Sequence, residues 1–313
     1  MTVARIFRFG VEAMGGGMDA KGWRLLARRV ESLGYATLVV VDHLGDQLAP
    51  MPAMLAAAEA TSRLRVGSFV FANDLRHPAL LAKDAATVDL LSDGRLELGI
   101  GAGWNRVEHE RLGIPFASAG TRVERLAESV SILKGLFEQE AFSFDGRHYS
   151  VRDLAGLPRP VQRPHPPILV GGGGRRVLSL AAREADIVGL NPTLASGSVD
   201  ARAMVSATAD ATAKKAAWVC GAAGARFRKL ELNIRIYHTM ITVERTAAVA
   251  DVAAATGLTP AQVLDSPHVL IGTIDQVVMD LEERRERYGL SYIVVTVDAC
   301  EPFAPVVARL SGT

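Results

Sequence analysis

The sequence predicts an α/β fold, a (β/α)8 TIM barrel that spans residues 1–313 as one domain with insertions in its loops. Eight short apolar segments rich in β-branched residues alternate with helical patterns and are joined mostly by short links. The length of 313 residues and a hydrophobic content of 49% support a core of that size. The main alternative, an open doubly wound sheet, would carry G-x-G-x-x-G after its first strand, and the glycines at 15–17 lack that spacing.

The first half contains four strand–helix units, with strands expected at residues 6–11, 37–41, 64–71 and 96–100. The first helix begins after Asp19, a favourable N-cap residue. Pro78 opens the third helix at a position where proline is tolerated. Thr121 and Glu124 have the spacing of a capping box, which predicts a helix from there to about residue 138.

The second half contains four more strands, expected at residues 168–170, 186–190, 232–241 and 291–297. Thr273 and Gln276 form a second capping box, for a helix over 274–288. Insertions are expected around 139–165, with a hairpin on a type I′ turn at Asp145 and Gly146, and around 193–230, which is alanine-rich and partly helical.

Composition excludes several classes of function. The formal net charge is +1, and no Lys/Arg-rich run suggests nucleic-acid binding. No apolar run approaches the roughly 18–20 residues of a membrane helix. Without a signal-peptide pattern or paired cysteine motif, we expect a cytoplasmic protein. No metal site is expected, because Glu108, His109 and Glu110 are neighbours that do not share a helix face. His148, His165 and His268 are expected at the surface.

Two loop openings at strand ends combine ring-binding and acid–base residues. Asp42 and His43 follow the second strand, where an imidazole can donate a proton or bond to a cofactor ring. The alternative is a solvated histidine beside a turn-capping aspartate. Gly101, Gly103 and Trp104 follow the fourth strand, where glycines let a flat ring approach and the indole can wall a pocket. The alternative there is a tight turn with a core tryptophan.

A third opening is rich in glycine. Gly171, Gly172, Gly173 and Gly174 stand between the fifth strand and a helix that starts with Arg175 and Arg176. Amide groups in a positive-φ glycine nest at a helix N-terminus, with a guanidinium beside them, would bind a phosphate. The alternative is a flexible link.

Motifs along nearly the whole chain resemble the luciferase-like monooxygenase superfamily, and within it the actinobacterial oxidoreductases that depend on the deazaflavin coenzyme F420. The motifs are ESLGY (31–35), DH (42–43), RHP (76–78), AAT (85–87), SDGR (92–95), GIGAGW (99–104), LGIPF (112–116), PPILVGG (166–172) and ADIV (185–188).

The resemblance implies a flavin or deazaflavin in the barrel mouth, with its phosphate at the glycine nest and His43 beside the ring as the catalytic residue. The implied cofactor contacts are Asp42, Ser68, Phe69, Val70, Asn73, Gly101, Gly103, Trp104, Gly171, Gly172, Gly173, Gly174, Arg175 and Asn191. The resemblance also implies a non-prolyl cis peptide bond at Phe69–Val70, or one residue earlier at Ser68–Phe69.

Trp104 stands where some sugar-phosphate dehydrogenases of this superfamily carry an acidic glutamate. The resemblance therefore implies hydride transfer between F420 and an apolar or aromatic organic substrate, in a homodimer. One alternative is a monooxygenase that uses reduced FMN from a separate reductase. A second is a non-catalytic flavin-binding or ligand-binding barrel.

Overall fold

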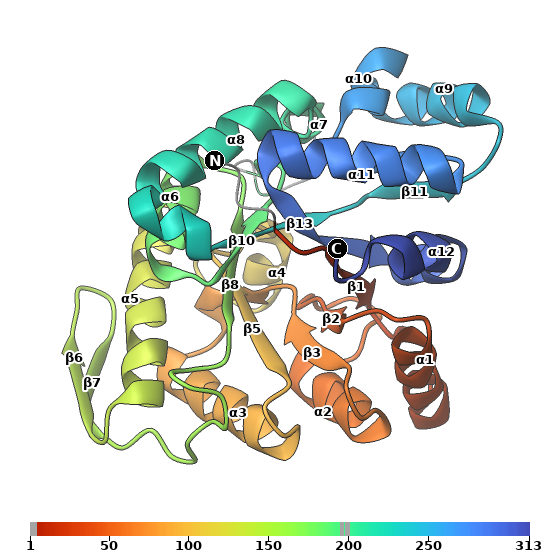
Figure 1. Cartoon of the computed structure of the whole chain (residues 1–313). Coiled ribbons are helices and arrows are strands. Elements are labelled where there is room, and N and C mark those ends of the chain that lie inside the picture. The colour runs from red at the N-terminus through yellow and green to blue at the C-terminus, as the bar shows by residue number, and fades with distance from the viewer. Residues whose placement is uncertain (1–4, 195–196, 198–200) are drawn as a thin grey trace.

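Eight parallel strands close into a barrel, which confirms the predicted fold class (Figure 1). The computed structural model describes residues 5–194, 197 and 201–313, apart from the side chains of residues 201 and 202. Pairing of the third with the fourth barrel strand, through Val66 and Leu96, completes the circle. The barrel strands are β1 (Arg8–Ala13), β2 (Thr37–Val40), β3 (Arg65–Ser68), β5 (Leu96–Gly101), β8 (Ile168–Gly172), β9 (Ile187–Leu190), β10 (Glu231–Arg235) and β13 (Leu290–Thr296).

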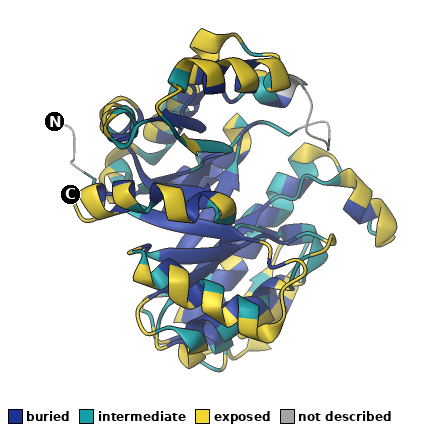
Figure 2. Cartoon of the chain, turned by 90° about the vertical axis from the view of Figure 1, so that its right-hand side faces the viewer, coloured by how far each residue is buried: buried dark blue, intermediate teal, exposed yellow. Residues whose placement is uncertain are grey.

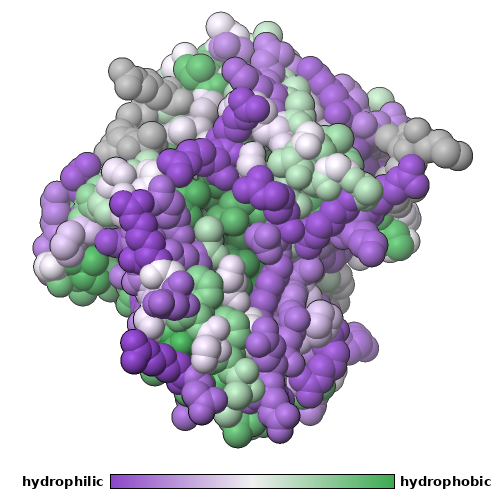
Figure 3. Space-filling model, turned by 90° about the vertical axis from the view of Figure 1, so that its left-hand side faces the viewer, coloured by the Kyte–Doolittle hydropathy of each residue, from purple (hydrophilic) through white to green (hydrophobic). Residues whose placement is uncertain are grey.

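Helices surround the barrel and bury one face each against it, as the dark blue strands and yellow outer helix faces of Figure 2 show. The outer helices are α1 (Ala20–Ser32), α2 (Pro50–Ala60), α3 (Pro78–Leu91), α5 (Ala119–Glu138), α6 (Arg175–Glu184), α8 (Ala209–Ala223), α11 (Ile274–Tyr288) and α12 (Cys300–Leu310). Short 3-10 turns lie at Asn73–Leu75, Gly224–Lys229 and Val297–Ala299. The outer surface on the side of α5 and α6 is largely hydrophilic, and smaller groups of hydrophobic residues lie among the hydrophilic ones (Figure 3). Among the described residues, no helix is both long and apolar enough to cross a membrane.

Most of the predicted helix starts are confirmed. The Asp19 carboxylate accepts the Gly22 N–H, Pro78 is the first residue of α3, and the Thr273–Gln276 capping box is present. The start expected for α5 is wrong. The Ser118 hydroxyl accepts the Thr121 N–H, so Thr121 already lies in the first turn of the helix.

The third barrel strand is interrupted. The peptide bond Phe69–Val70 is cis, as expected from the resemblance, and the chain resumes at β4 (Phe71–Ala72). This segment lies tightly against β5: a Cβ on Gly99 would be 2.0 Å from the Ser68 carbonyl oxygen. Glycine is therefore needed at that position of β5 for the two strands to approach.

The strand predicted over 232–241 is in fact two strands. β10 ends in the barrel, where the Ile236 N–H donates to the Val294 carbonyl. The chain then leaves as β11 (His238–Ile241), which pairs with β12 (Val269–Gly272) outside the barrel. Helices α9 (Arg245–Thr256) and α10 (Pro260–Asp265) lie between them. We call residues 236–272 the outer insertion.

Two other stretches differ in detail from expectation. The hairpin β6 (Phe142–Asp145) and β7 (Ser150–Leu154) is present, but four residues connect its strands in place of a two-residue turn. The Glu128 carboxylate accepts the N–H groups of residues 147–149 and so holds this wider connection. In the stretch 193–230, α7 (Ala201–Val205) precedes α8, which takes the place of a barrel helix packed on α6. Residues 195–196 and 198–200 lie outside the described residues.

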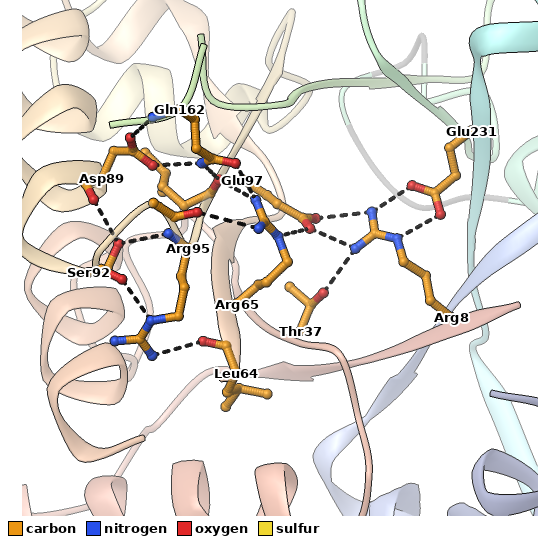
Figure 4. A network of polar contacts seen from close by, with 12 residues as sticks. Arg8, Thr37, Leu64, Arg65, Asp89, Ser92, Arg95, Glu97, Gln162 and Glu231 are labelled. Carbon is orange, nitrogen blue, oxygen red and sulfur yellow. Dashed lines mark hydrogen bonds and ion pairs between the residues drawn. The ribbon is translucent and has the colours of Figure 1, made fainter. Parts of the chain in front are cut away.

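Charged side chains close the barrel at the amino ends of its strands (Figure 4). The Arg8 guanidinium lies 2.6 Å from the carboxylates of both Glu97 and Glu231, and Arg65 lies 2.7 Å from Glu97. Arg8 also stacks on the Tyr292 ring, 3.6 Å from its centre. This network, the floor network, leaves the opposite end of the barrel for a ligand, as is usual for the fold.

Candidate functional site

A cavity of about 820 Å³ opens at the carboxyl ends of the barrel strands. Its lining is mostly apolar, and it includes nearly all of the site residues expected from the sequence. The structure brings together Asp42, His43, Phe69, Val70, Gly101, Gly103, Trp104, Gly171, Gly172, Gly173, Gly174, Arg175 and Asn191. Two expected contacts lie outside the lining. The Ser68 hydroxyl bonds to the backbone of Gly99, and the Asn73 amide donates to Tyr149.

His43 forms a pair with the carboxylate of Glu108, a residue that the sequence suggests only as a possible metal ligand. Its Nδ1 lies 3.0 Å from Oε1 and 3.1 Å from Oε2 of Glu108, in the short helix α4 (Arg106–Arg111). A carboxylate only accepts, so Nδ1 carries the proton and Nε2 is free to exchange one with a ligand. The Leu44 N–H donates to Oε1 of Glu108, and the Trp104 ring meets the imidazole edge-on at 5.5 Å.

Asp42 has a different position from its neighbour His43. Both of its oxygens are engaged by Arg76, at 2.6 and 2.8 Å, and one of them also accepts the Ala72 N–H. This fork holds the loop after β2 against β4. Asp42 therefore fixes the wall of the cavity, and its direct contact with a cofactor stays a prediction.

Glycines make room for one wall of the cavity. A Cβ on Gly101 would lie 2.8 Å from Cγ2 of Val70, so glycine lets the Val70 side chain cross the end of β5. Gly103 has a φ of +74°, in the left-handed region that favours glycine. Its carbonyl accepts the Arg122 Nε–H at 3.2 Å. This hydrogen bond holds the loop that carries Trp104 against α5.

The four glycines before α6 do not form a positive-φ nest, which corrects that part of the sequence analysis: none of them has positive φ. Gly172 and Gly173 are required by packing, because a Cβ would lie 2.4 Å from Val177 Cγ1 and from the Pro192 carbonyl oxygen respectively. A Cβ on Gly174 would meet nothing within 4 Å. Gly174 is the N-cap residue of α6 and gives no side-chain cap.

Unengaged donors at this junction fit a phosphate. The first turn of α6 has amide groups without a side-chain cap, and Arg175 has no ion pair or side-chain hydrogen bond within the described part of the chain. Arg176 is held at 3.2 Å by Glu124. Asn191 is fixed beside the junction, since its N–H donates to Gly172 and its carbonyl accepts from Lys215 Nζ. Burial lowers the pKa of Lys215 to about 8.

The other end of the cavity is polar and lies under the outer insertion. Arg235 and Glu12 form an ion pair with contacts of 2.5 Å. Burial raises the pKa of Glu12, and the opposing effect of Arg235 is smaller. His268 also lines this end and is only 1% exposed, so its expected surface position is wrong. Burial lowers the pKa of His268 to about 3.

Comparison with known proteins gives one family. Residues 2–291 match the model of the luciferase-like monooxygenase family. The chain is 36% identical over 127 residues to the FMNH(2)-dependent dimethylsulfone monooxygenase of Pseudomonas putida, covering 41% of this chain and 35% of that protein. It is 32% identical over 164 residues to an F420-dependent glucose-6-phosphate dehydrogenase of Beutenbergia cavernae, covering 50% of this chain and 48% of that protein. The chain thus spans less than half the length of these two relatives.

Solved structures share the whole fold at low identity. Monooxygenase RslO1 from Streptomyces bottropensis matches with a TM-score of 0.74 and 23% identity, covering 97% of each chain. The coenzyme F420 dependent tetrahydromethanopterin reductase from Methanopyrus kandleri matches with a TM-score of 0.78 and 17% identity, covering 98% of this chain and 100% of that one.

Proposed function

We propose that this chain, which belongs to the luciferase-like monooxygenase family, is an oxidoreductase that transfers a hydride between coenzyme F420 and an apolar or aromatic organic substrate. The observation that carries the proposal is the His43–Glu108 pair beside Trp104, at the mouth of a mostly apolar cavity. F420, when bound, would supply the hydride acceptor or donor. Relatives named as F420-dependent dehydrogenases support this choice.

The residues present fit such a group. The uncapped start of α6 and Arg175 would hold its phosphate, while Phe69, Val70 and Trp104 would surround its ring. His43 would donate or accept the substrate proton at Nε2, since Glu108 holds the proton at Nδ1 and fixes the ring orientation. The apolar walls would exclude water from the reacting atoms.

A monooxygenase that uses reduced FMN is the second candidate. The relative with 36% identity is such an enzyme, and FMN also has a flat tricyclic ring and a ribityl phosphate. The described residues of the cavity lining include no feature that accepts one ring and excludes the other. Binding therefore has to decide between the two cofactors.

Fluorescence of Trp104, which lines the cavity, provides the test. We expect F420 to quench tryptophan emission with a dissociation constant of about 1 μM or below, and FMN to bind at least about tenfold more weakly. A Trp104→Phe variant should lose most of the quenching, because the remaining tryptophans, Trp23 and Trp218, lie outside the cavity lining. Thermal-shift assays should still detect binding of the cofactor to this variant. Tighter binding of FMN would favour the monooxygenase. Binding of neither cofactor would refute the oxidoreductase assignment, and tight binding without turnover on a broad substrate panel would favour a non-catalytic carrier.

A further inference from the structure

Three buried nitrogens of the cavity lining, Nε2 of His109, Nε of Arg235 and Nε2 of His268, have no hydrogen-bond partner among the described residues, and the nitrogen of His268 lies at the polar end of the cavity. Nδ1 of His268 lies 2.9 Å from the Arg235 carbonyl oxygen, and Nε2 has no hydrogen-bond partner among the described residues. A carbonyl only accepts, so Nδ1 carries the proton and Nε2 of the neutral ring is an acceptor. A buried acceptor without a donor is costly, and such atoms are rare unless a ligand or water supplies the donor.

The backbone around His268 fixes the direction of this acceptor. The Tyr237 N–H donates to the His268 carbonyl at 2.9 Å, and the His268 N–H donates to the Ser266 hydroxyl at 3.3 Å. The Ser266 hydroxyl in turn donates to the Ala207 carbonyl. These three donors are therefore already used, and rotation of the ring would break the bond to the Arg235 carbonyl.

The charges at this end of the cavity favour a neutral ligand. Arg235, which lines the cavity, forms an ion pair with Glu12, and the buried ammonium of Lys215, outside the lining, donates to the carbonyls of Asn191 and Ser206. Among the described residues that line this end of the cavity, the guanidinium of Arg235 thus has its charge balanced by Glu12, which disfavours a phosphate or carboxylate as ligand. The outer insertion contributes uncharged polar side chains to this lining, and beside them an apolar wall formed by Val252, Leu258 and Val269.

We propose that His268 is a specificity residue, whose Nε2 accepts a hydrogen bond from a neutral hydroxyl or N–H group on an otherwise apolar substrate. This inference rests on the proposed function only in assigning the cavity to a substrate. It narrows the apolar or aromatic class to molecules that carry at least one hydrogen-bond donor. It also gives the outer insertion a role, because the insertion supplies both the acceptor and the apolar wall.

A matched pair of probes tests the proposal on the protein without cofactor. 2-Naphthol and 2-methoxynaphthalene have similar size and aromatic surface, but only the naphthol has an O–H donor. Titration calorimetry on the wild type should give about tenfold tighter binding of the naphthol, as expected for one hydrogen bond to a buried acceptor. His268→Leu should reduce this ratio to about one. Thr256→Val, a change at another hydroxyl of the same lining, should leave the ratio unchanged.

Circular dichroism identifies the variants that fold. His268→Gln, which keeps both a donor and an acceptor, should retain a ratio above that of His268→Leu. A ratio near one in the wild type overturns the proposal even if no variant folds. An unchanged ratio in folded His268→Leu also overturns it. Loss of the wild-type ratio when F420 is added, at retained naphthol binding, would assign the acceptor to the cofactor and overturn the substrate role. A failure of F420 to bind would refute the proposed function without changing the naphthol result.

Discussion

His43 and Glu108 show how two residues 65 positions apart form one unit at the residue scale. The carboxylate holds the proton at Nδ1, and the Leu44 N–H in turn holds the carboxylate. Glu108 is therefore a positioning residue, while His43 is the candidate catalytic residue. This division predicts different effects of substitution at the two positions.

His43→Ala should lower kcat by about 10²–10⁴-fold, the range expected for loss of a general acid or base. Glu108→Gln should lower kcat by a smaller factor with little change in KM, because the amide still fills the space but orients the imidazole less firmly. Stopped-flow measurement of F420 reduction, on the best substrate of an alcohol and aromatic panel, checks both values. His77→Asn is the matched control, because His77 is an exposed histidine that caps α3 outside the cavity lining. Wild-type kcat in folded His43→Ala would contradict the catalytic role.

At the scale of elements, the sequence predicts the barrel because its strands are buried on both faces and therefore form apolar runs. The sequence does not reveal that the seventh predicted strand is split into β10 and β11. Apolar residues continue through 232–241, although the chain leaves the barrel near Ile236. The wide hairpin connection depends on Glu128, which lies outside the hairpin. Such long-range partners leave no local pattern.

In the candidate site too, local sequence patterns are predictable and long-range partners are not. The glycine-rich strand ends and His43 are predictable because barrel ligands bind at the carboxyl ends of strands. The pairs Glu108–His43 and Glu12–Arg235 are not, because 65 and 223 residues separate their members and no periodicity links them. The surface position expected for His268 is wrong because a neighbouring proline suggests an exposed loop, whereas the turn that precedes β12 buries this residue within the outer insertion.

The junction of β8 and α6 gives a prediction at this scale. Gly174→Val should fold as the wild type, because its φ of −95° and ψ of 154° suit a β-branched residue and its Cβ meets no atom. It should nevertheless weaken F420 binding by at least about tenfold, because the side chain would stand where the phosphate approaches the first turn of α6. Fluorescence titration and thermal unfolding separate the two effects. Gly172→Val is the contrasting variant, since its side chain would collide with Val177 and lower the unfolding temperature. Unchanged affinity in folded Gly174→Val would move the phosphate site elsewhere.

For the whole molecule, the floor network joins the beginnings of four barrel strands, β1, β3, β5 and β10 (Figure 4). Glu97 is the central carboxylate and is only 4% exposed, with Arg8 and Arg65 on either side. Burial alone raises the pKa of Glu97, but the two guanidinium groups outweigh burial, and its pKa lies below the ordinary value. The ionised network therefore stabilises the closed barrel.

Glu97→Gln should lower the free energy of unfolding at neutral pH by about 3–5 kcal/mol, because two guanidinium groups lose their shared buried partner. The pH dependence should change as well. A carboxyl whose pKa is lower in the folded state contributes stability that is present above the unfolded pKa of about 4.3, and loses it as pH falls through the folded pKa. Urea titrations between neutral pH and about pH 3 should thus show a smaller acid-dependent loss of stability in the variant than in the wild type. Glu301→Gln, which removes an exposed partner of Arg29, should leave the curve unchanged. Parallel curves for wild type and Glu97→Gln would show that the floor network is not what acid disrupts.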